Sequence, residues 1–337
     1  MRIAIIGATG MIGHHTARAA VDRGHELVVI HRASSNLDQL ADLKFTSAVA
    51  DLDDRDALTC ALKGVDAVIN CAGYYPTAPR PWREEVKTAT TQMDHFYAAC
   101  AQHQLHKIVY LGAAIALPRH PQGKPGDETL EYIGEPANKN PYLQVKVAMD
   151  AQARARAKEG LPVVVGIPSM TFGEYDYGPT TGRLLVELAN KRLPGYVTGN
   201  RNVIYAGDAG LGLIRVCEEG RVGERYLLTG ENHSMDELVR KMTSAAGVPM
   251  PKAIPLAGAM LVAKLQALRY RWFKGPLPKV DATGIAVMSG GQFLIGTKAR
   301  EELGFLASVS TDEAICRALQ WFKAQGYVSD STTGPHQ

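Results

Sequence analysis

The sequence predicts an α/β protein built on a doubly wound, parallel sheet of seven strands. Short runs rich in valine and isoleucine alternate with longer stretches of helical periodicity. A glycine-rich turn follows the first of these runs, and the later connections are long enough for right-handed βαβ crossovers. With 337 residues, the chain can form this core together with a second, smaller lobe.

The elements follow from the same alternation. Strands are expected at residues 3–6, 26–30, 45–50, 66–71, 107–111, 162–167 and 225–229. Helices are expected at residues 11–23, 57–63, 82–104, 141–159, 183–190, 208–219, 234–246, 256–272 and 312–325. Proline, glycine and tyrosine cluster between residues 169 and 205, which predicts loops around the single helix there. A flexible tail is expected at residues 329–337.

The composition narrows the class of protein. Hydrophobic residues make up 46% and charged residues 21%, and the net charge of +3 gives no reason to expect a nucleic-acid or membrane-surface partner. The five cysteines are scattered without C-x-x-C spacing, which predicts reduced thiols and no metal site. The first strand begins at once, and no apolar run approaches the length of a membrane span. A soluble, cytoplasmic protein is therefore expected.

The glycine-rich turn is the first candidate binding site. Its sequence is Gly7-Ala-Thr-Gly-Met-Ile-Gly13, so the glycines recur every third residue. Glycine permits a tight reversal and lets backbone N–H groups at a helix N-terminus approach a pyrophosphate. We expect a dinucleotide to contact Gly7, Thr9, Gly10, Met11, Ile12 and Gly13. The alternative is a strand–turn–helix in which glycine serves only the turn.

Two later strand ends would border the adenosine half of such a dinucleotide. His31 and Arg32 follow the second strand, next to the expected adenosine ribose. An acidic residue at this position would bond a ribose 2′-OH and repel a 2′-phosphate. These basic groups favour NADP over NAD, unless Arg32 is an ordinary solvated arginine. Asp51 and Leu52 follow the third strand and could contact the adenine. Asp53 or Asp54 could equally cap the next helix.

The fourth strand ends in small residues. Cys71, Ala72 and Gly73 would let a cofactor ribose pass close to the backbone, and Tyr74 follows them.

The catalytic candidates are Tyr142 and Lys146. They are four residues apart in the helix expected at 141–159, so they share one face of it. Asn140 is a suitable N-cap for this helix, and Pro141 a suitable first residue. A nearby ammonium would lower the pKa of the phenol, which could then exchange a proton with a substrate oxygen. Tyr-x-x-x-Lys often occurs by chance, so its weight comes from its combination with the glycine turn and the seven-strand pattern.

With these motifs in place, the chain resembles the extended short-chain dehydrogenase/reductases, the NAD(P)-dependent epimerase/dehydratase superfamily. Within that superfamily it is most similar to bacterial dihydroflavonol-4-reductase-like and nucleoside-diphosphate-sugar epimerase proteins. The resemblance runs nearly end to end. It includes the glycine turn, Asp51-Leu52, Tyr142 with Lys146, and the segments at residues 160–168, 178–183, 223–230, 298–305 and 321–322.

The resemblance implies a Rossmann-type domain at residues 1–168, completed by about 203–229. Residues 169–202 and 230–305 would form a substrate lobe, followed by a C-terminal helix within 306–328. Tyr142 would be the acid/base and Lys146 its partner. Leu111 and Pro168 would meet the cofactor, the latter at the nicotinamide carboxamide. Tyr74 and Arg183 are the expected substrate contacts, and the helices at about 84–104 and 141–159 would form a homodimer interface.

One departure from the family pattern affects catalysis. The family has a serine or threonine after the fifth strand, where its hydroxyl bonds the substrate oxygen, and Ala113 aligns with it here. Between Thr91 and Ser169 the only serine or threonine is Thr129. Loss of one such donor costs about 10²–10³ in rate. Another donor could replace it, with Ser169 or Thr171 favoured over Tyr74 or His120 because they follow Pro168. Alternatively, the reaction could be one that does not need this hydroxyl.

Three functions remain open from the sequence. The first is an NADP-preferring oxidoreductase or epimerase acting on a secondary alcohol or ketone, with reduction of a small or apolar carbonyl preferred. The second is a nucleotide-sugar epimerase or dehydratase, although no convincing basic cluster for a diphosphate is evident. The third is an NADP(H)-binding regulatory or sensor protein with little or no catalysis.

Overall fold

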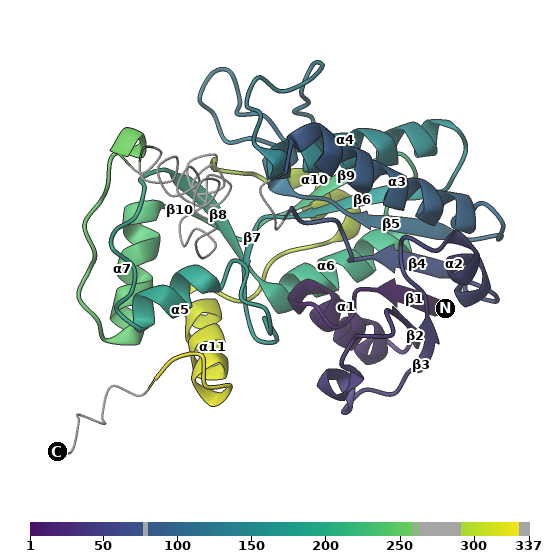
Figure 1. Cartoon of the computed structure of the whole chain (residues 1–337), viewed down its shortest axis with the longest axis horizontal. Coiled ribbons are helices and arrows are strands. Elements are labelled where there is room, and N and C mark those ends of the chain that lie inside the picture. Colours follow the sequence, from purple (N-terminus) through teal and green to yellow (C-terminus); the bar gives the residue numbers. More distant parts are fainter. Residues whose placement is uncertain (77–79, 259–260, 262–290, 330–337) are drawn as a thin grey trace.

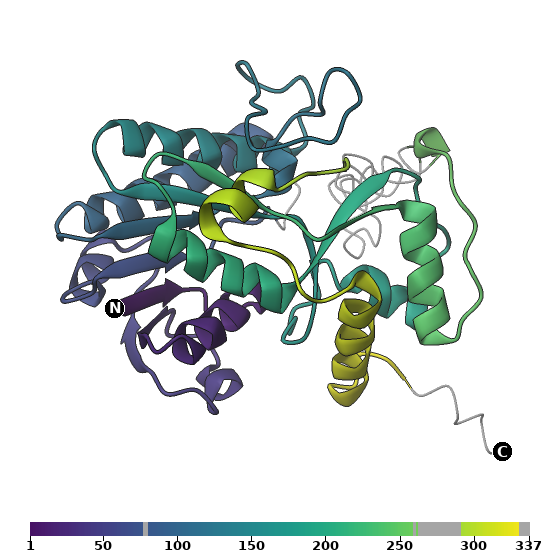
Figure 2. The same cartoon turned by 180° about the vertical axis from the view of Figure 1, so that it is seen from behind.

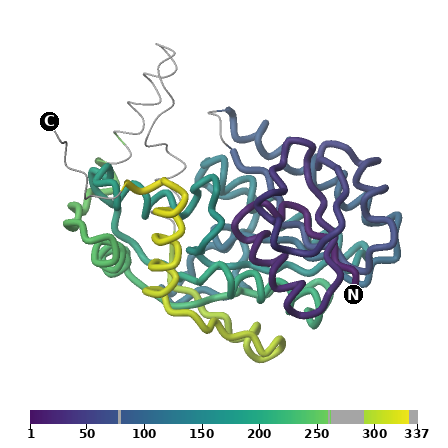
Figure 3. Tube along the Cα trace, turned by 90° about the horizontal axis from the view of Figure 1, so that it is seen from below, coloured from purple at the N-terminus to yellow at the C-terminus, as the bar shows by residue number. Residues whose placement is uncertain are grey.

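The computed structural model describes residues 1–76, 80–258, 261 and 291–329 (Figure 1). An α/β domain contains the N-terminus, and a smaller lobe lies beside it. Figure 3 shows the two parts side by side, with the N-terminal strand at the end remote from the lobe.

Among the described residues, the α/β domain holds one seven-stranded parallel sheet in the order β3-β2-β1-β4-β5-β6-β9. The order reverses beside β1, which pairs with both β2 and β4. The carboxyl ends of the strands at such a reversal open onto a crevice. The strands are β1 (Arg2–Ile6), β2 (Glu26–His31), β3 (Thr46–Val49), β4 (Ala67–Asn70), β5 (Lys107–Leu111), β6 (Val163–Pro168) and β9 (Arg225–Leu228).

Helices cover both faces of this sheet, as expected when the strands are buried on both sides (Figures 1 and 2). One face packs against α2 (Arg55–Ala61), α3 (Trp82–Cys100) and α4 (Pro141–Lys158). The other packs against α1 (Met11–Asp22), α6 (Ala206–Glu219) and α10 (Thr297–Leu303). Two short 3₁₀ turns, η1 (Leu37–Leu40) and η2 (Ala114–Ala116), lie in connections.

The smaller lobe has a hydrophobic core of its own. A three-stranded sheet runs in the order β10-β8-β7 and packs with three helices. These elements are β7 (Met170–Phe172), β8 (Asn200–Tyr205), β10 (Glu231–Ser234), α5 (Arg183–Ala189), α7 (Met235–Ala246) and α11 (Thr311–Ala324).

The predicted fold class is confirmed, including the return of the chain to the sheet in β9. The sequence did not predict β7, β8, β10 or α10, because these are short segments of three to seven residues whose pairing or packing is non-local. The loops expected between residues 169 and 205 therefore need correction. Most of the helix predicted at 256–272 and the tail from 330 lie outside the described residues.

One segment that the resemblance assigned to the substrate lobe packs in the α/β domain instead. Residues 297–303, placed in the range of the substrate lobe, form α10, and Ala299 and Leu303 pack into the core of the α/β domain.

Candidate functional site

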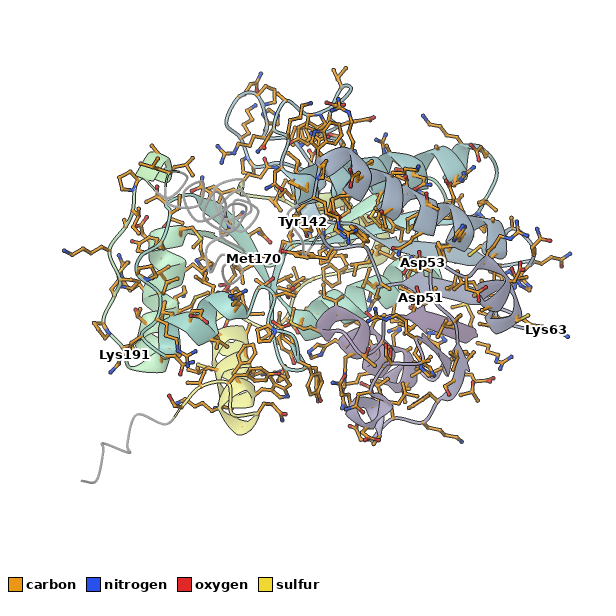
Figure 4. The ribbon with its side chains drawn as sticks, viewed as in Figure 1. Asp51, Asp53, Lys63, Tyr142, Met170 and Lys191 are labelled. Atoms are coloured by element: carbon orange, nitrogen blue, oxygen red, sulfur yellow. The ribbon has the colours of Figure 1, made fainter. Side chains whose placement is uncertain are left out.

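A cavity of about 770 Å³ lies between the carboxyl edge of the large sheet and the lobe. Figure 4 shows Tyr142 and Met170, which both line it, near the middle of the molecule where the two parts meet. The cavity brings together most of the predicted site. Of those residues it contains Gly7, Thr9, Gly10, Met11, Ile12, Gly13, Cys71, Gly73, Leu111, Ala113, Tyr142, Lys146, Pro168, Ser169, Thr171 and Arg183.

The glycine turn has the close packing that such a site requires. Gly7 has φ +82°, a left-handed conformation that favours glycine. A Cβ at Gly13 would lie 2.1 Å from the Gly7 carbonyl oxygen, so no side chain fits there. Gly10 has no such crowding, because the nearest atom to its Cβ position lies at 3.5 Å. The turn therefore presents bare backbone at the start of α1, which fits a dinucleotide pyrophosphate.

The residues predicted for the adenosine half lie outside the cavity lining. His31 ends β2, and its ring Nδ1 lies 2.9 Å from the carbonyl oxygen of Arg32, which is exposed. The Asp51 carboxylate accepts a hydrogen bond from the backbone N–H of Asp53 at 3.2 Å. Asp54 caps α2 by accepting from the Ala57 N–H at 2.9 Å. The structure thus assigns the cap to Asp54 and leaves Arg32 facing solvent.

The segment after β4 passes close to the catalytic candidates. The Asn70 side chain accepts a hydrogen bond from the Ala72 N–H at 3.0 Å and fixes the turn. A Cβ at Gly73 would lie 3.0 Å from Lys146 Nζ. Of the next two tyrosines, Tyr74 lies beside Glu85, whose buried carboxylate raises the pKa of the phenol, whereas Tyr75 lines the cavity. Tyr74, expected to contact substrate, is not part of the cavity lining.

Helix α4 positions Tyr142 and Lys146. Asn140 caps it as predicted, accepting from the Leu143 N–H at 3.2 Å. Lys146 Nζ lies 5.7 Å from the centre of the Tyr142 ring. Burial lowers the pKa of Lys146 to about 8.

The sequence predicted that Lys146 would lower the pKa of Tyr142. In the protein without bound cofactor or substrate, this prediction is wrong. Burial raises the pKa of this phenol, and the nearby Tyr75 phenol raises it further. The Lys146 ammonium is thus not the dominant influence on Tyr142, because desolvation of the phenolate outweighs it.

The residues considered as replacements for the missing serine differ in whether they line the cavity. Ala113 lines the cavity just before η2, so its methyl group stands where a hydroxyl was expected. Ser169 also lines the cavity, and its buried Oγ has no hydrogen-bond partner among the described residues. Thr171 is buried at the cavity wall. His120 is outside the lining, and its ring nitrogen accepts from the Gln122 N–H at 3.2 Å.

Two residues that line the cavity, Arg201 and Tyr75, were missed by sequence reasoning. Arg201 lies on β8, is 5% exposed and lines the cavity with Arg183. Burial lowers the pKa of Arg201 to about 10, and the neighbouring Arg119 lowers it further. Arg201 was missed because its strand was not predicted. Tyr75 was missed because the sequence cannot decide which of two adjacent tyrosines turns inward.

Within the described ranges, no cluster of three or more His, Cys, Asp or Glu residues could hold a metal ion. Over the same part of the chain, no helix is both long and apolar enough to cross a membrane.

A family model described as "NAD dependent epimerase/dehydratase family" matches residues 3–228. The chain belongs to this family of NAD-dependent enzymes. The matched region includes the glycine turn and the Tyr142–Lys146 pair, and a nicotinamide dinucleotide is the cofactor that the family description names.

Relatives of known name extend over the whole chain. A crystal structure titled as a nucleoside-diphosphate-sugar epimerase from Pseudomonas aeruginosa is 45% identical, with a TM-score of 0.86 and coverage of 98% of this chain and 99% of that one. A Synechocystis protein named with the dihydroflavonol 4-reductases is 28% identical over 96% of this chain and 95% of its own. The 2-alkyl-3-oxoalkanoate reductase of Stenotrophomonas maltophilia is 26% identical over 94% and 98%.

Proposed function

We propose that this protein is an NADPH-preferring oxidoreductase that reduces a ketone carried on an apolar framework, or oxidises the corresponding secondary alcohol. The observation that carries the proposal is the cavity in which the glycine turn and the Tyr142–Lys146 pair meet a largely apolar wall. That wall includes Ile115, Met170, Leu184, Leu193, Met235 and Leu294. The name of the oxoalkanoate reductase also describes a carbonyl on an apolar chain.

Each part of the cavity has a proposed role. The glycine turn binds the pyrophosphate through backbone N–H groups, with the lining residues Cys71, Gly73, Leu111 and Pro168 along the rest of the dinucleotide. Ala72, between Cys71 and Gly73 but outside the lining, is assigned to the same stretch. NADPH, when bound, supplies the hydride. Tyr142 donates a proton to the substrate oxygen, and Lys146 balances the negative charge that then forms on the phenol. Ser169 Oγ donates a second hydrogen bond to that oxygen in place of the hydroxyl missing at Ala113.

A carbonyl screen with variants tests these roles. Tyr142→Phe removes only the hydroxyl, so we expect kcat to fall by about 10²–10⁴ while NADPH affinity is unchanged. Ser169→Ala should cost about 10²–10³, and Ala113→Ser added to Ser169→Ala should restore part of the rate. Turnover unaffected by Tyr142→Phe would rule out the acid/base role.

The NADPH preference rests on His31 and Arg32 beside the expected ribose. We expect NADPH to bind more tightly than NADH, and Arg32→Ala to reduce the difference by weakening NADPH alone. Titration of both cofactors by calorimetry measures this. Equal affinity for the two cofactors in the parent protein would contradict the preference.

A nucleotide-sugar epimerase is the second candidate function. Arg183 and Arg201 at the cavity wall favour an anionic substrate, and the P. aeruginosa structure carries that name. The two functions differ in a simple measurement, because epimerisation consumes no NADPH overall whereas ketone reduction oxidises one NADPH per turnover. A third candidate is a redox sensor with little catalysis, favoured by Ala113. Tight NADPH binding without turnover of either substrate class would support it.

The family resemblance also supports proposals for the substrate lobe and for the dimer interface. We assign substrate binding to residues 169–202 and to the part of 230–305 that precedes α10, and homodimer formation to α3 and α4. Light scattering measures the oligomeric state.

A further inference from the structure

The reacting end of the cavity contains a second tyrosine whose role remains to be assigned. Tyr75 lies five residues beyond the end of β4, and its ring centre is 4.8 Å from that of Tyr142 at an interplanar angle of 47°. The Tyr75 phenol also raises the pKa of Tyr142, which indicates that the two phenol groups interact electrostatically. Tyr75 therefore stands directly beside the proposed proton donor.

The turn after β4 determines which tyrosine reaches this place. Gly73 lies against Lys146 and Met149, so the chain passes α4 at close range with no side chain between. Tyr74 then turns to Glu85 and packs against the core of the α/β domain. Tyr75, next in the chain, turns to the opposite side and lines the cavity.

The exposure of Tyr75 distinguishes it from a core residue. Its side chain is 48% exposed, which is unusual for an aromatic ring that packs on another ring beside a cavity. A ring that packs on Tyr142 and is about half exposed at the cavity can contact a ligand with little loss of side-chain entropy.

The neighbouring lining restricts what would contact this ring. Ala113, Ala114 and Ile115 are the small and apolar residues that follow β5 in the same cavity. They offer no side-chain hydrogen bond, so a polar substituent there would lose its hydration without compensation.

We propose that Tyr75 is a specificity-determining residue, whose ring selects ketones or alcohols with a flat or ring-shaped apolar group next to the reacting carbon. This inference rests on the proposed reduction of ketones. The ring of Tyr75 covers one face of that group while Tyr142 bonds the oxygen, so the oxygen and the substituent are fixed together. Edge-to-face or offset contact with an aromatic group is the geometry such a ring favours.

The test compares two ketones that differ only beside the carbonyl, acetophenone and butan-2-one, with NADPH as reductant. We expect the ratio of kcat/KM for acetophenone to that for butan-2-one to fall about tenfold in Tyr75→Ala, mainly through the KM of acetophenone. Tyr75→Phe keeps the ring and should retain the ratio within about twofold. Tyr132→Ala, which truncates a partly buried tyrosine outside the cavity, is the matched control.

The outcomes separate this inference from the proposed function. Reduction of neither ketone by the parent protein would overturn the proposed function. An unchanged ratio in a folded Tyr75→Ala protein, checked by thermal melting, would overturn the role of Tyr75 alone. Equal losses in Tyr75→Phe and Tyr75→Ala would also overturn it, because they would assign the effect to the hydroxyl. Binding of cyclohexanol or 1-phenylethanol to the NADPH-loaded protein, which contains no oxidant for the alcohol, gives a second readout without turnover when it is measured by calorimetry.

Discussion

At the scale of single residues, burial determines the pKa values of the two catalytic candidates, Tyr142 and Lys146. Lys146 and Tyr142 are both held in their neutral forms more strongly than in water, because desolvation lowers the pKa of the ammonium and raises that of the phenol. The phenol is therefore fully protonated through the physiological range and ready to donate. The Lys146 ammonium, by contrast, has a pKa of about 8 and therefore titrates close to physiological pH.

The activity should consequently fall as pH rises through about 8, where Lys146 loses its proton. The raised pKa of Tyr142 places its own titration well above this range, so the decrease reports the lysine. We expect a tenfold decrease in kcat/KM per pH unit above 8, measured for ketone reduction from pH 6 to 10. Lys146→Arg keeps the charge at every pH and should abolish the decrease, even with a lower plateau. The same decrease in Lys146→Arg would assign it to another group.

Gly13 gives the second prediction at this scale. Its Cβ would overlap the Gly7 carbonyl oxygen at 2.1 Å, so Gly13→Ala must move α1 away from the turn. We expect unfolding free energy to fall by about 1–3 kcal/mol and NADPH affinity to fall at least about tenfold. Thermal melting and calorimetry measure the two effects. Gly258→Ala is the control and should lower neither quantity, because the nearest described atom to its Cβ position is in the Ile254 side chain at 3.9 Å.

At the scale of elements, a cluster of aromatic and basic side chains joins α1 to the lobe. The ring of His14, in α1, stacks on Tyr175 with 3.7 Å between centres and 4° between planes. The Arg18 guanidinium lies 4.8 Å from the same ring centre, and Trp321 of α11 meets it edge-on. Tyr175 has φ +66°, a strained backbone for tyrosine that the surrounding contacts must stabilise.

This cluster fixes the loop that enters the cavity. Asp176 follows Tyr175, and its buried carboxylate accepts hydrogen bonds from the backbone N–H groups of Thr180 and Gly182 at 3.1–3.2 Å. Thr180, Thr181 and Arg183 then line the cavity from the lobe. The position of these side chains thus depends on a contact made to α1.

Tyr175→Ala should therefore weaken substrate binding without affecting the cofactor. We expect KM for the ketone to rise about tenfold and NADPH affinity to stay within about twofold, because the glycine turn is untouched. Steady-state kinetics and calorimetry separate the two quantities. Tyr175→Phe keeps the stacked ring and should resemble the parent protein. Equal loss of cofactor affinity in Tyr175→Ala would contradict this arrangement.

At the scale of the whole molecule, the large sheet was predictable because its signals are local. Each buried strand is a short apolar run, and Tyr142 and Lys146 can be paired from their spacing on one helix. The lobe was less predictable. β7 has three residues, and its partner β8 lies about thirty residues later, so no local pattern indicates the pairing. Arg201 and Tyr75 enter the cavity through tertiary packing, for which the sequence has no periodic signal.

The contact between the two parts also buries two histidines with little polar compensation. His14 is fully buried, and both its ring nitrogens lack hydrogen-bond partners among the described residues. His15 is 5% exposed and lies 3.7 Å from a carboxylate oxygen of Glu174. Burial lowers the pKa of both imidazoles, that of His14 to about 3. Arg18 lowers both further, Arg317 also lowers that of His15, and Asp42 and Glu174 partly oppose the shifts at His14 and His15, respectively.

These histidines should make the protein sensitive to mild acid. Below pH 6.5 the unfolded chain binds protons on both imidazoles while the folded chain does not, so stability falls as pH falls. Between pH 6.5 and 5 the loss is about 2 kcal/mol for each histidine that stays neutral in the fold. His14→Phe keeps a ring on Tyr175 and removes one titrating group, so its loss over this range should be about half. Urea unfolding at pH 7, 6 and 5 measures the difference, and an equal loss in both proteins would show that His14 is not responsible.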